Sequence, residues 1–411
     1  MFPTFTPQCL PKDSQISAEN KSGLLPAVCL LAALLCGMAT FAQDIPEENG
    51  SAKNSDADSS TEAPEGEEEE KKKGGKFLIL PIFITEPAIG EGLGGGVVYF
   101  HNKDNKDKRR VETATSMGDT GSKQKPPPTA TGAFGFYTSN DTAGVGVGHS
   151  NSFMDDKYRV IGALANMRIN SEIFLGDIPF GFQLQGNLAY ANGKRRMGKS
   201  NMFLGLSLMA MDADIGFKID LGNTPPIPLS DFAFTNVGLA GSAIYDSRDN
   251  TTMPNKGQLI DFTAWRYDDA LGSDFDYWSG RLKAHSFHQL HEKFVLGLRF
   301  DVSSVDGSPP FFAVPFVSLR GIPALRYQAR TAGAFEVEGR YSFSKRWAGI
   351  VFGGAGFTKN DEGPLETGQN IKSIGTGVRF QALAVQDIWV GLDIAKGPEE
   401  YAWYIQIGQG W

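Results

Sequence analysis

From residue 77 to the C-terminus, apolar and polar residues alternate in segments of roughly ten residues. In the segment from Phe294 to Val302 every second residue is apolar, whereas Arg299 and Asp301 are among the residues between them. Successive side chains of a β-strand point to opposite faces, so this pattern gives one apolar and one polar face. Roughly ten residues are also what a tilted strand needs to cross a bilayer. The pattern therefore predicts strands with lipid on one face and water on the other.

About sixteen such segments can be counted, and a closed bacterial barrel requires an even number. Their centres are Leu80, Val97, Phe134, Val147, Val160, Leu184, Leu206, Leu239, Phe262, Leu282, Leu298, Val337, Val351, Val378, Val390 and Ile405. We expect an all-β fold, a transmembrane antiparallel β-barrel with both termini on the periplasmic side. Links then alternate between periplasmic turns, such as residues 343–347, and outer loops, such as residues 305–332. Residues 102–129 are long for the periplasmic turn that this order requires.

A soluble β-sandwich or barrel also alternates, with its apolar face buried and its polar face in bulk water. Three features favour the membrane: an N-terminal leader, an aromatic C-terminal residue, and aromatic residues near many segment ends. The aromatic residues near segment ends are Tyr99, Phe100, Trp265, Tyr267, Trp278, Trp347, Trp403 and Trp411. In the last segment we expect Trp403, Ile405, Ile407 and Trp411 to share one face.

Residues 23–42 form a long apolar run with lysines before it and small residues at its end. This is the pattern of a signal peptide, residues 1–42, cleaved before Gln43. The alternative is a membrane anchor, since about 20 apolar residues can span a bilayer. A barrel protein held by an inner-membrane helix would not reach the outer membrane, which favours the signal peptide. All three cysteines lie in this leader, so we expect no disulfide and no thiolate metal site in the mature chain.

Residues 43–76 consist mainly of Asp, Glu, Ser, Asn and Lys and contain almost no large apolar side chain. Such a segment buries too little surface to offset the entropy of ordering, so we expect a disordered acidic periplasmic linker. The outer-membrane β-barrel domain then covers residues 77–411. Lysines 71–73 follow glutamates 67–70, which cancel their charge, so nucleic acid is not an expected partner.

Residues 318–328 read SLRGIPALRYQ, with two arginines, a glycine and a proline but no periodicity. They lie in the expected outer loop between strands eleven and twelve. We interpret this segment as a loop that folds back into the barrel as its plug or latch.

The barrel resembles that of the bacterial surface antigen family, which includes the BamA and TamA assembly factors and their smaller relatives. The resemblance covers about residues 81–411 and rests on SLRGIPALRYQ from Ser318, DSRDNTTMPNKG at 246–257, EVEGRYSF from Glu336, GVRF near Val378 and DIA at Asp393. It implies that the loop lies in the lumen, with its arginine on acidic residues of the inner wall. The expected latch is Arg320, Gly321 and Ile322. The expected partners on the inner wall are Glu336, Glu338 and Arg340.

Two departures from the family pattern concern the latch: Ile322 replaces the usual aromatic residue, and Gly354 stands where assembly factors often have an aspartate. The resemblance also implies a C-terminal insertion signal at Trp411 and a periplasmic turn motif. The turn motif consists of Asp246, Arg248, Asp249, Asn250, Pro254 and Gly257.

The resemblance implies translocation or insertion of proteins or lipids at the outer membrane, without enzymatic chemistry and without a cofactor. The implied partners are outer-membrane lipid and the outer-membrane assembly machinery that inserts this chain. The assembly factors carry periplasmic POTRA domains, for which residues 43–76 are too short. In that family the first and last strands pair weakly, and the proposed mechanism uses this seam. A passive pore, a purely structural protein and a barrel-wall lipase are the alternatives, and the oligomeric state stays open.

For three further motifs we favour an interpretation without a binding site. Residues 90–95 match GxGxxG, but a strand follows where a dinucleotide site needs a helix. His285, His288 and His291 would align on a helix but alternate on a strand, so we expect no metal site there. The aspartates between residues 268 and 276 could bind calcium with carbonyl help, although a solvated loop is the simpler interpretation. These aspartates are Asp268, Asp269, Asp274 and Asp276.

Overall fold

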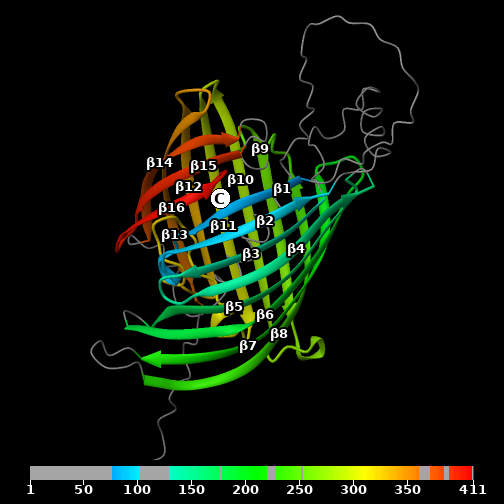
Figure 1. Ribbon diagram of the computed structural model, residues 1–411, viewed down its shortest axis with the longest axis vertical. Coiled ribbons are helices and arrows are strands. Elements are labelled where there is room, and N and C mark those ends of the chain that lie inside the picture. Colours follow the sequence, from blue (N-terminus) through cyan, green and yellow to red (C-terminus); the bar gives the residue numbers. More distant parts are fainter. Residues whose placement is uncertain are drawn as a thin grey trace, which may run out of the picture.

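The computed structural model describes residues 76–101, 129–154, 156–175, 178–219, 227–250, 253–360, 371–383, 388–409 and 411. Within these residues, sixteen antiparallel strands form one sheet in which each strand pairs with its neighbours in sequence (Figure 1). All sixteen expected segment centres lie inside strands, which confirms the predicted fold. The expected signal peptide, the expected linker up to residue 75 and most of the long link between the second and third strands lie outside the described residues, and Lys76, the last residue of the expected linker, begins the first strand. No described helix is long and apolar enough to cross a membrane.

The strands of the first half are β1 (Lys76–Ile84), β2 (Gly92–Phe100), β3 (Ala130–Thr138), β4 (Ala143–Phe153), β5 (Tyr158–Leu175), β6 (Ile178–Arg196), β7 (Met202–Ile219) and β8 (Ile227–Asp246). Those of the second half are β9 (Gly257–Tyr267), β10 (Tyr277–His291), β11 (Phe294–Gly307), β12 (Thr331–Ser342), β13 (Trp347–Lys359), β14 (Lys372–Leu383), β15 (Ile388–Lys396) and β16 (Tyr401–Ile407). Three short 3-10 helices accompany them: η1 (Pro87–Ile89), η2 (Asp269–Leu271) and η3 (Phe311–Ala313). We call the end with the short β10–β11 and β12–β13 turns the periplasmic end.

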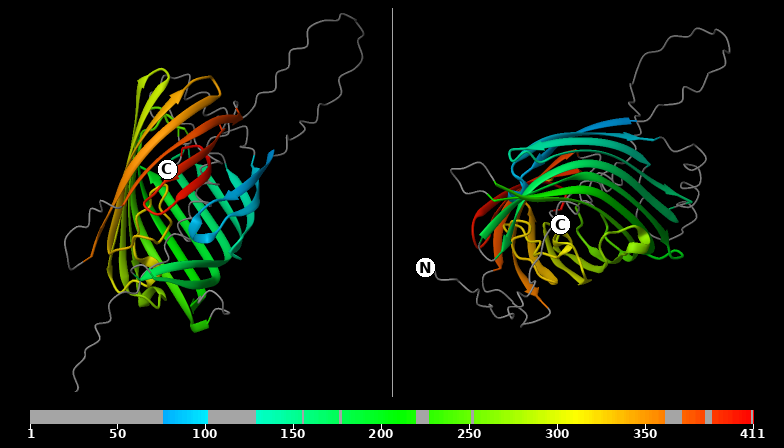
Figure 2. Two further views of the ribbon diagram at one scale, coloured as in Figure 1. Left: turned by 90° about the vertical axis from the view of Figure 1, so that its left-hand side faces the viewer. Right: turned by 90° about the horizontal axis from the view of Figure 1, so that it is seen from below.

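The sheet curls until its two edge strands, β1 and β16, lie side by side (Figures 1 and 2). In the hydrogen-bonded order of the sheet these strands are the two ends and are not joined to each other. One described side-chain bond beside this junction is donated by Trp403 Nε1 of β16 to Glu91 Oε1 at 3.0 Å. The barrel is therefore nearly closed, and its weakest line is the β1–β16 seam.

Large apolar side chains form the outward surface of the wall. Leu93, Leu164, Leu206, Val351 and Ile374 are all exposed on this surface. An exposed apolar band of this extent suits lipid and not water. In most of β11 and β12 the outward and inward residues divide as the alternation predicts, with Arg299, Asp301, Glu336, Glu338 and Arg340 on the inner wall.

The inner wall is not polar all the way round, which corrects the expected division into lipid outside and water inside. On β5 to β7 the inward residues of the outer half are apolar and buried, as at Met167, Leu184 and Ile215. Their outward neighbours are polar, as at Asn187 and Asp212. These strands have 18 or 19 residues, well beyond the roughly ten that cross a bilayer, so their outer halves stand above the lipid. Above the bilayer water lies outside, and the apolar face turns inward.

The loop between β11 and β12 folds inward and packs on this apolar wall. Phe311 and Phe312 of η3 are buried in the same cluster as the inner residues of β5 to β8. The rest of the loop doubles back on itself, since Val317 N donates to Tyr327 O at 2.9 Å and Ala329 N to Pro315 O at 3.0 Å. Residues 318–328 are thereby placed within the barrel, as expected.

Candidate functional site

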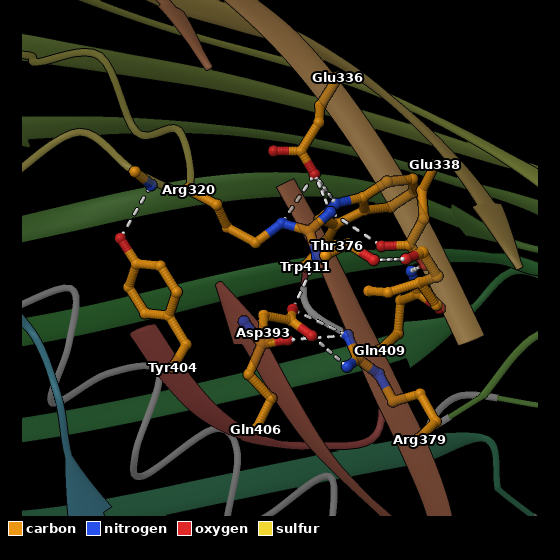
Figure 3. Close-up of polar contacts among 12 residues, drawn as sticks. Arg320, Glu336, Glu338, Thr376, Arg379, Asp393, Tyr404, Gln406, Gln409 and Trp411 are labelled. Carbon is orange, nitrogen blue, oxygen red and sulfur yellow. Dashed lines mark hydrogen bonds and ion pairs between the residues drawn. The ribbon is translucent and has the colours of Figure 1, made fainter. Parts of the chain in front are cut away.

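Arg320 reaches the acidic inner wall from the inward loop (Figure 3). Its Nε donates to Glu336 Oε1 at 3.0 Å, and its Nη2 donates to the same oxygen and to Glu338 Oε2, the latter at 2.8 Å. On the other side, Nη1 donates to Asp393 Oδ2 at 2.9 Å. The structure thus brings Arg320 together with Glu336 and Glu338, the two carboxylates that the sequence suggested. Asp393 of β15 is a third partner that the sequence interpretation missed.

A second arginine completes this cluster. Arg379 of β14 donates to both oxygens of Asp393, with Nη2 at 3.0 Å from Oδ2, and also to Gln406 Oε1 at 3.2 Å. We call Arg320, Glu336, Glu338, Arg379 and Asp393 the latch cluster. All five are buried, and their formal charge is −1, from two cations and three anions. Burying charges is costly unless each is paired and hydrogen-bonded, so removing one member is expected to be strongly destabilising.

The backbone of the loop turns sharply at Gly321 to reach the last two strands. Gly321 has a φ of +88°, which L side chains rarely adopt. Its N–H donates to Tyr404 Oη of β16 at 2.9 Å. A Cβ on Gly397 would lie 1.8 Å from the Gly321 carbonyl oxygen, so both glycines are needed for this close approach. The loop is therefore seated on the strands that form one side of the seam.

The apolar side of the latch explains both departures from the family pattern. Ile322 is buried in a cluster with Val317 and Leu319. A Cβ on Gly354 would lie 2.6 Å from Leu319 Cδ1, so the glycine of β13 makes room for the loop. The carboxylate that β13 cannot supply comes from Asp393 on β15. Alternation could have found this residue, since Asp393 is a charge on the inward face of β15, between Gly391 and Ala395.

The C-terminal residues reach the same carboxylates. After β16 ends at Ile407, Gln409 Nε2 donates to Glu338 Oε1 at 2.7 Å, and Trp411 Nε1 donates to Glu336 Oε1. The Trp411 ring lies 5.6 Å from that of Phe287 on the inner wall. The expectation that Trp411 shares an outward face with Trp403 is therefore wrong, because the chain leaves the strand before Trp411 and turns into the lumen.

Arg340 also differs from its expected place as a partner of the latch. Its Nη2 donates to Pro254 O at 2.7 Å and to Asn255 Oδ1 at 2.6 Å, and its Nη1 donates to Gln409 Oε1 at 3.3 Å. Arg340 thus holds the β8–β9 turn, and Gln409 links it to Glu338. Arg340 and Arg320 both carry a positive charge, so their guanidinium groups repel each other and Arg340 bonds to other partners.

The β8–β9 turn motif forms a compact internal network. Arg248 pairs with Asp246 through two bonds of 2.9 Å. Asp249 Oδ1 accepts from Asn255 N at 2.9 Å, and Asn250 Oδ1 accepts from Met253 N at 2.9 Å. Gly257 ends the motif with a φ of +104°. The motif residues therefore shape a turn that Arg340 fastens to the inner wall.

The loop also touches both sides of the seam, through residues that the sequence did not single out. Near β1, Ala324 N donates to Glu86 Oε1 at 3.1 Å. In the β15–β16 turn, Glu399 Oε1 accepts from Arg326 Nε at 2.7 Å and from Tyr327 Oη at 2.9 Å. The burial of the Glu86 carboxyl, together with the charge of Glu400, raises its pKa above the ordinary value of 4.5, against two backbone hydrogen bonds that lower it. No sequence signal marks these glutamates, because they stand in loops outside the alternation.

The remaining motifs take no part in this site. Asp268 accepts from the backbone of η2 and from Arg266, Asp276 also pairs with Arg266, and Asp274 accepts from Thr235 N. His285 is buried on the inner wall, whereas His288 is exposed on the outer one. In the described ranges, no group of three or more His, Cys, Asp or Glu residues could hold a metal ion.

One serine and one histidine meet on the outward wall. Ser286 Oγ and His288 Nε2 of β10 lie 2.8 Å apart, near the periplasmic end. Hydrolysis at such a pair would need a third group that orients the histidine. In the described part of the chain, no side chain bonds the other ring nitrogen of His288.

A family model described as the Omp85 superfamily domain matches residues 83–318, which is more than half of the 411 residues and ends just before Arg320. Among solved structures, BamA from Haemophilus ducreyi lacking POTRA domains 1–3 matches with 11% identity and a TM-score of 0.55, over 81% of this chain and 70% of that chain.

CdiB from Escherichia coli matches with 9% identity and a TM-score of 0.54, over 80% of this chain and 62% of that chain. CdiB from Acinetobacter baumannii matches with 10% identity and a TM-score of 0.50, over 80% of this chain and 59% of that chain. This chain therefore spans about six tenths of the length of the CdiB structures. At these identities the likeness concerns the fold, and no curated protein matches.

Proposed function

The chain belongs to the Omp85 superfamily of outer-membrane β-barrels, and from this premise we propose that it inserts or translocates proteins or lipids at the outer membrane. In this proposal the barrel opens at the β1–β16 seam, and residues 318–328 are the latch that controls the opening. The observation that carries the proposal is that this loop contacts both sides of a seam that lacks a strand ladder.

The latch cluster holds the C-terminal side of the seam. Asp393 lies on β15 and Tyr404 on β16, so an outward movement of these strands must break their bonds to Arg320 and Gly321. On the other side, Glu86 is held by the loop backbone. A neutral hydrogen bond contributes about 0.5–1.5 kcal/mol and one to a charged group about 1.5–3 kcal/mol. The free energy of opening the seam therefore depends on a small number of loop contacts.

The proposal includes no enzymatic chemistry and no cofactor. Among the residues that the structure describes, none orients His288 as an esterase requires, so the barrel-wall lipase has little support. A passive pore is disfavoured by the loop and C-terminal residues that lie inside the barrel (Figure 2). The similar BamA and CdiB barrels support insertion or translocation over either alternative.

A reversible lock on the seam tests the proposal. The barrel has no cysteine, so Glu91→Cys with Trp403→Cys gives a unique pair beside the seam, which a cleavable bismaleimide can bridge. We expect the bridged protein to fail to complement depletion of the native protein, and cleavage of the bridge to restore function. The readout is a census of outer-membrane proteins and lipids, which also identifies the substrate.

The matched control is Val337→Cys with Gly353→Cys, which bridges two strands that are already paired. This bridge should leave complementation intact. Full activity of the bridged seam variant would rule out opening at β1–β16. Steady conductance of the purified protein in a planar bilayer, increased by deletion of residues 305–332, would favour the passive pore instead.

A further inference from the structure

The periplasmic turn between β6 and β7 is strongly basic, and it lies beside the turn between β4 and β5, where Arg196 N donates to Lys157 O at 2.8 Å. Residues 152–159 and 194–202, which we call the basic rim, hold six Lys or Arg residues and two Asp residues. The whole chain, by contrast, has a formal net charge of −8. Lys157 and Arg195 of the rim are exposed. A local excess of this kind attracts an anionic partner.

One buried aspartate pairs with two of these cations and fixes the rim. Asp156 accepts from Arg159 through two bonds of 2.7 Å and also pairs with Arg196. Both guanidinium groups lie over the Phe203 ring, at 4.4 and 4.5 Å from its centroid. In the described ranges no carboxylate pairs with Lys157 or Arg195. These two charges are therefore available to a partner.

The rim contains aromatic and cationic side chains, which are typical of a membrane interface. Tyr158 stacks on Phe153 with ring centroids 5.5 Å apart, and Lys157 Nζ lies 5.7 Å from the Tyr158 centroid. On the outward face, Arg195 stands between Tyr158 of β5 and Leu204 of β7 in the strand register. Aromatic and cationic side chains gather where lipid headgroups lie, with their apolar stems toward the hydrocarbon.

An apolar groove begins just above the rim on the same outward face. On β6 it is lined by Ala189 and Ala191, which lie on the same face of the strand as Arg195, and Gly162 of β5 lies beside Ala191. Leu164 and Leu208 are among the larger side chains that line it, and its volume is about 470 Å³. Farther toward the outer ends of β5 and β6, the exposed residues Asn166 and Asn187 bond to each other at 2.9 Å.

The distance from Arg195 of the rim to Ala189 in the groove corresponds to one leaflet of the membrane. Arg195 and Ala189 are six positions apart on β6, which is about 20 Å along a strand and about 15 Å along the membrane normal at a tilt of about 40°. Half of a hydrocarbon core of about 30 Å is also about 15 Å. An acyl chain whose headgroup lies at the rim would therefore fill the groove.

We propose that the outward face of β5 to β7 binds an anionic phospholipid of the periplasmic leaflet. Its phosphate lies against Lys157 and Arg195, and an acyl chain lies in the groove. Charge decides between this occupant and an apolar protein surface, because an apolar surface would leave both cations unmatched. The site faces away from the lumen and is separate from the latch cluster.

Lipid binding is measured by native mass spectrometry of the full-length protein released from detergent, with phosphatidylglycerol and phosphatidylcholine as probes. The headgroup variant is Lys157→Gln with Arg195→Gln, and its control is Lys345→Gln in the β12–β13 turn. The groove variant is Gly162→Leu, since no atom lies within 4 Å of the position of an added Cβ. Its control is Gly280→Leu on the outward face of β10, which has the same free space.

Wild-type protein should retain phosphatidylglycerol in preference to phosphatidylcholine. Each lost cation should weaken this preference about 5-fold, so the headgroup double variant should lose about 25-fold. Gly162→Leu should reduce retention of phosphatidylglycerol, and both controls should match wild type. Equal retention of the two lipids by wild type, or unchanged retention by both variants, would overturn the proposal. Conversion of a dimer to a monomer by Gly162→Leu, with lipid binding intact, would assign the groove to a second copy of the chain and also overturn it.

Discussion

Replacing Arg320 with methionine tests the latch cluster most directly, because it keeps much of the side-chain length and removes the charge. In the wild type Arg320 lies between Glu336, Glu338 and Asp393, and Arg379 supplies the second positive charge of the cluster. The variant leaves three nearly inaccessible carboxylates around one guanidinium. Removing one partner of a buried ion pair costs about 3–5 kcal/mol, because the remaining charge is uncompensated. We expect a loss of stability of that size for Arg320→Met.

The loss can be measured as the midpoint of heat-induced unfolding, from the mobility shift of the barrel on a semi-native gel. Globular proteins have an unfolding entropy of roughly 2.1 cal/mol/K per residue, or roughly 0.6 kcal/mol/K for about 300 residues. A cost of about 3–5 kcal/mol then lowers the midpoint by about 5–8 °C. Arg320→Lys keeps the charge but loses the fork that meets two carboxylates at once, so its midpoint should lie between the two.

Arg326→Met in the same loop is the matched control. Arg326 pairs with Glu399, an exposed residue, and such ion pairs contribute about 0–1 kcal/mol. Adding Glu338→Gln to Arg320→Met should restore part of the midpoint, since it removes one uncompensated charge. An unchanged midpoint in Arg320→Met, or an equal loss in Arg326→Met, would refute the reasoning.

Two further predictions concern the seam and the C-terminus. The raised pKa of Glu86 means that the folded state binds the proton more tightly, so its contribution is complete below pH 4.5 and declines as the pH rises from 4.5 to the raised value. The heat midpoint is measured against pH, and Glu86→Gln should flatten its decline. A difference from wild type that is constant with pH would contradict the assignment of this decline to Glu86. Trp411→Phe keeps an aromatic ring beside Phe287 but loses the bond to Glu336. Its heat midpoint should fall by the equivalent of about 1.5–3 kcal/mol, while insertion in cells stays normal. A failure of insertion with an unchanged midpoint would show that the hydrogen bond does not contribute to stability.

The strands could be predicted from sequence because their signal is local. A period of two needs only neighbouring residues, and it located the strands and placed Glu336 and Glu338 on the inner wall. The inverted faces of the long strands were missed because the same alternation describes both situations. In a strand such as β6, apolar and polar residues alternate both above and within the bilayer. The length of 19 residues indicates that part of the strand lies above the bilayer.

The contacts of the latch could not be predicted from a single strand. Asp393 and Glu336 lie on strands separated by two others, and the curvature of the barrel brings them to the same guanidinium. Trp411 was placed on the wrong face because the alternation was extended past Ile407, where the strand ends. Such errors have a common cause, since hydrogen-bond partners across a lumen have no fixed spacing in sequence.

Glu336 and Glu338 bind two movable parts of the protein at once. Arg320 comes from the loop, whereas Gln409 and Trp411 follow the last strand of the seam. An outward movement of β16 would withdraw the C-terminal donors, leave the two carboxylates with fewer hydrogen bonds and strengthen their interaction with Arg320. The loop would then stay in the lumen while the seam opens, unless Asp393 moves with β15 and weakens the hold on Arg320. Contacting groups couple by about 0.5–3 kcal/mol, so a double-mutant cycle between Arg320→Lys and Trp411→Phe distinguishes these two cases by the sign of the coupling.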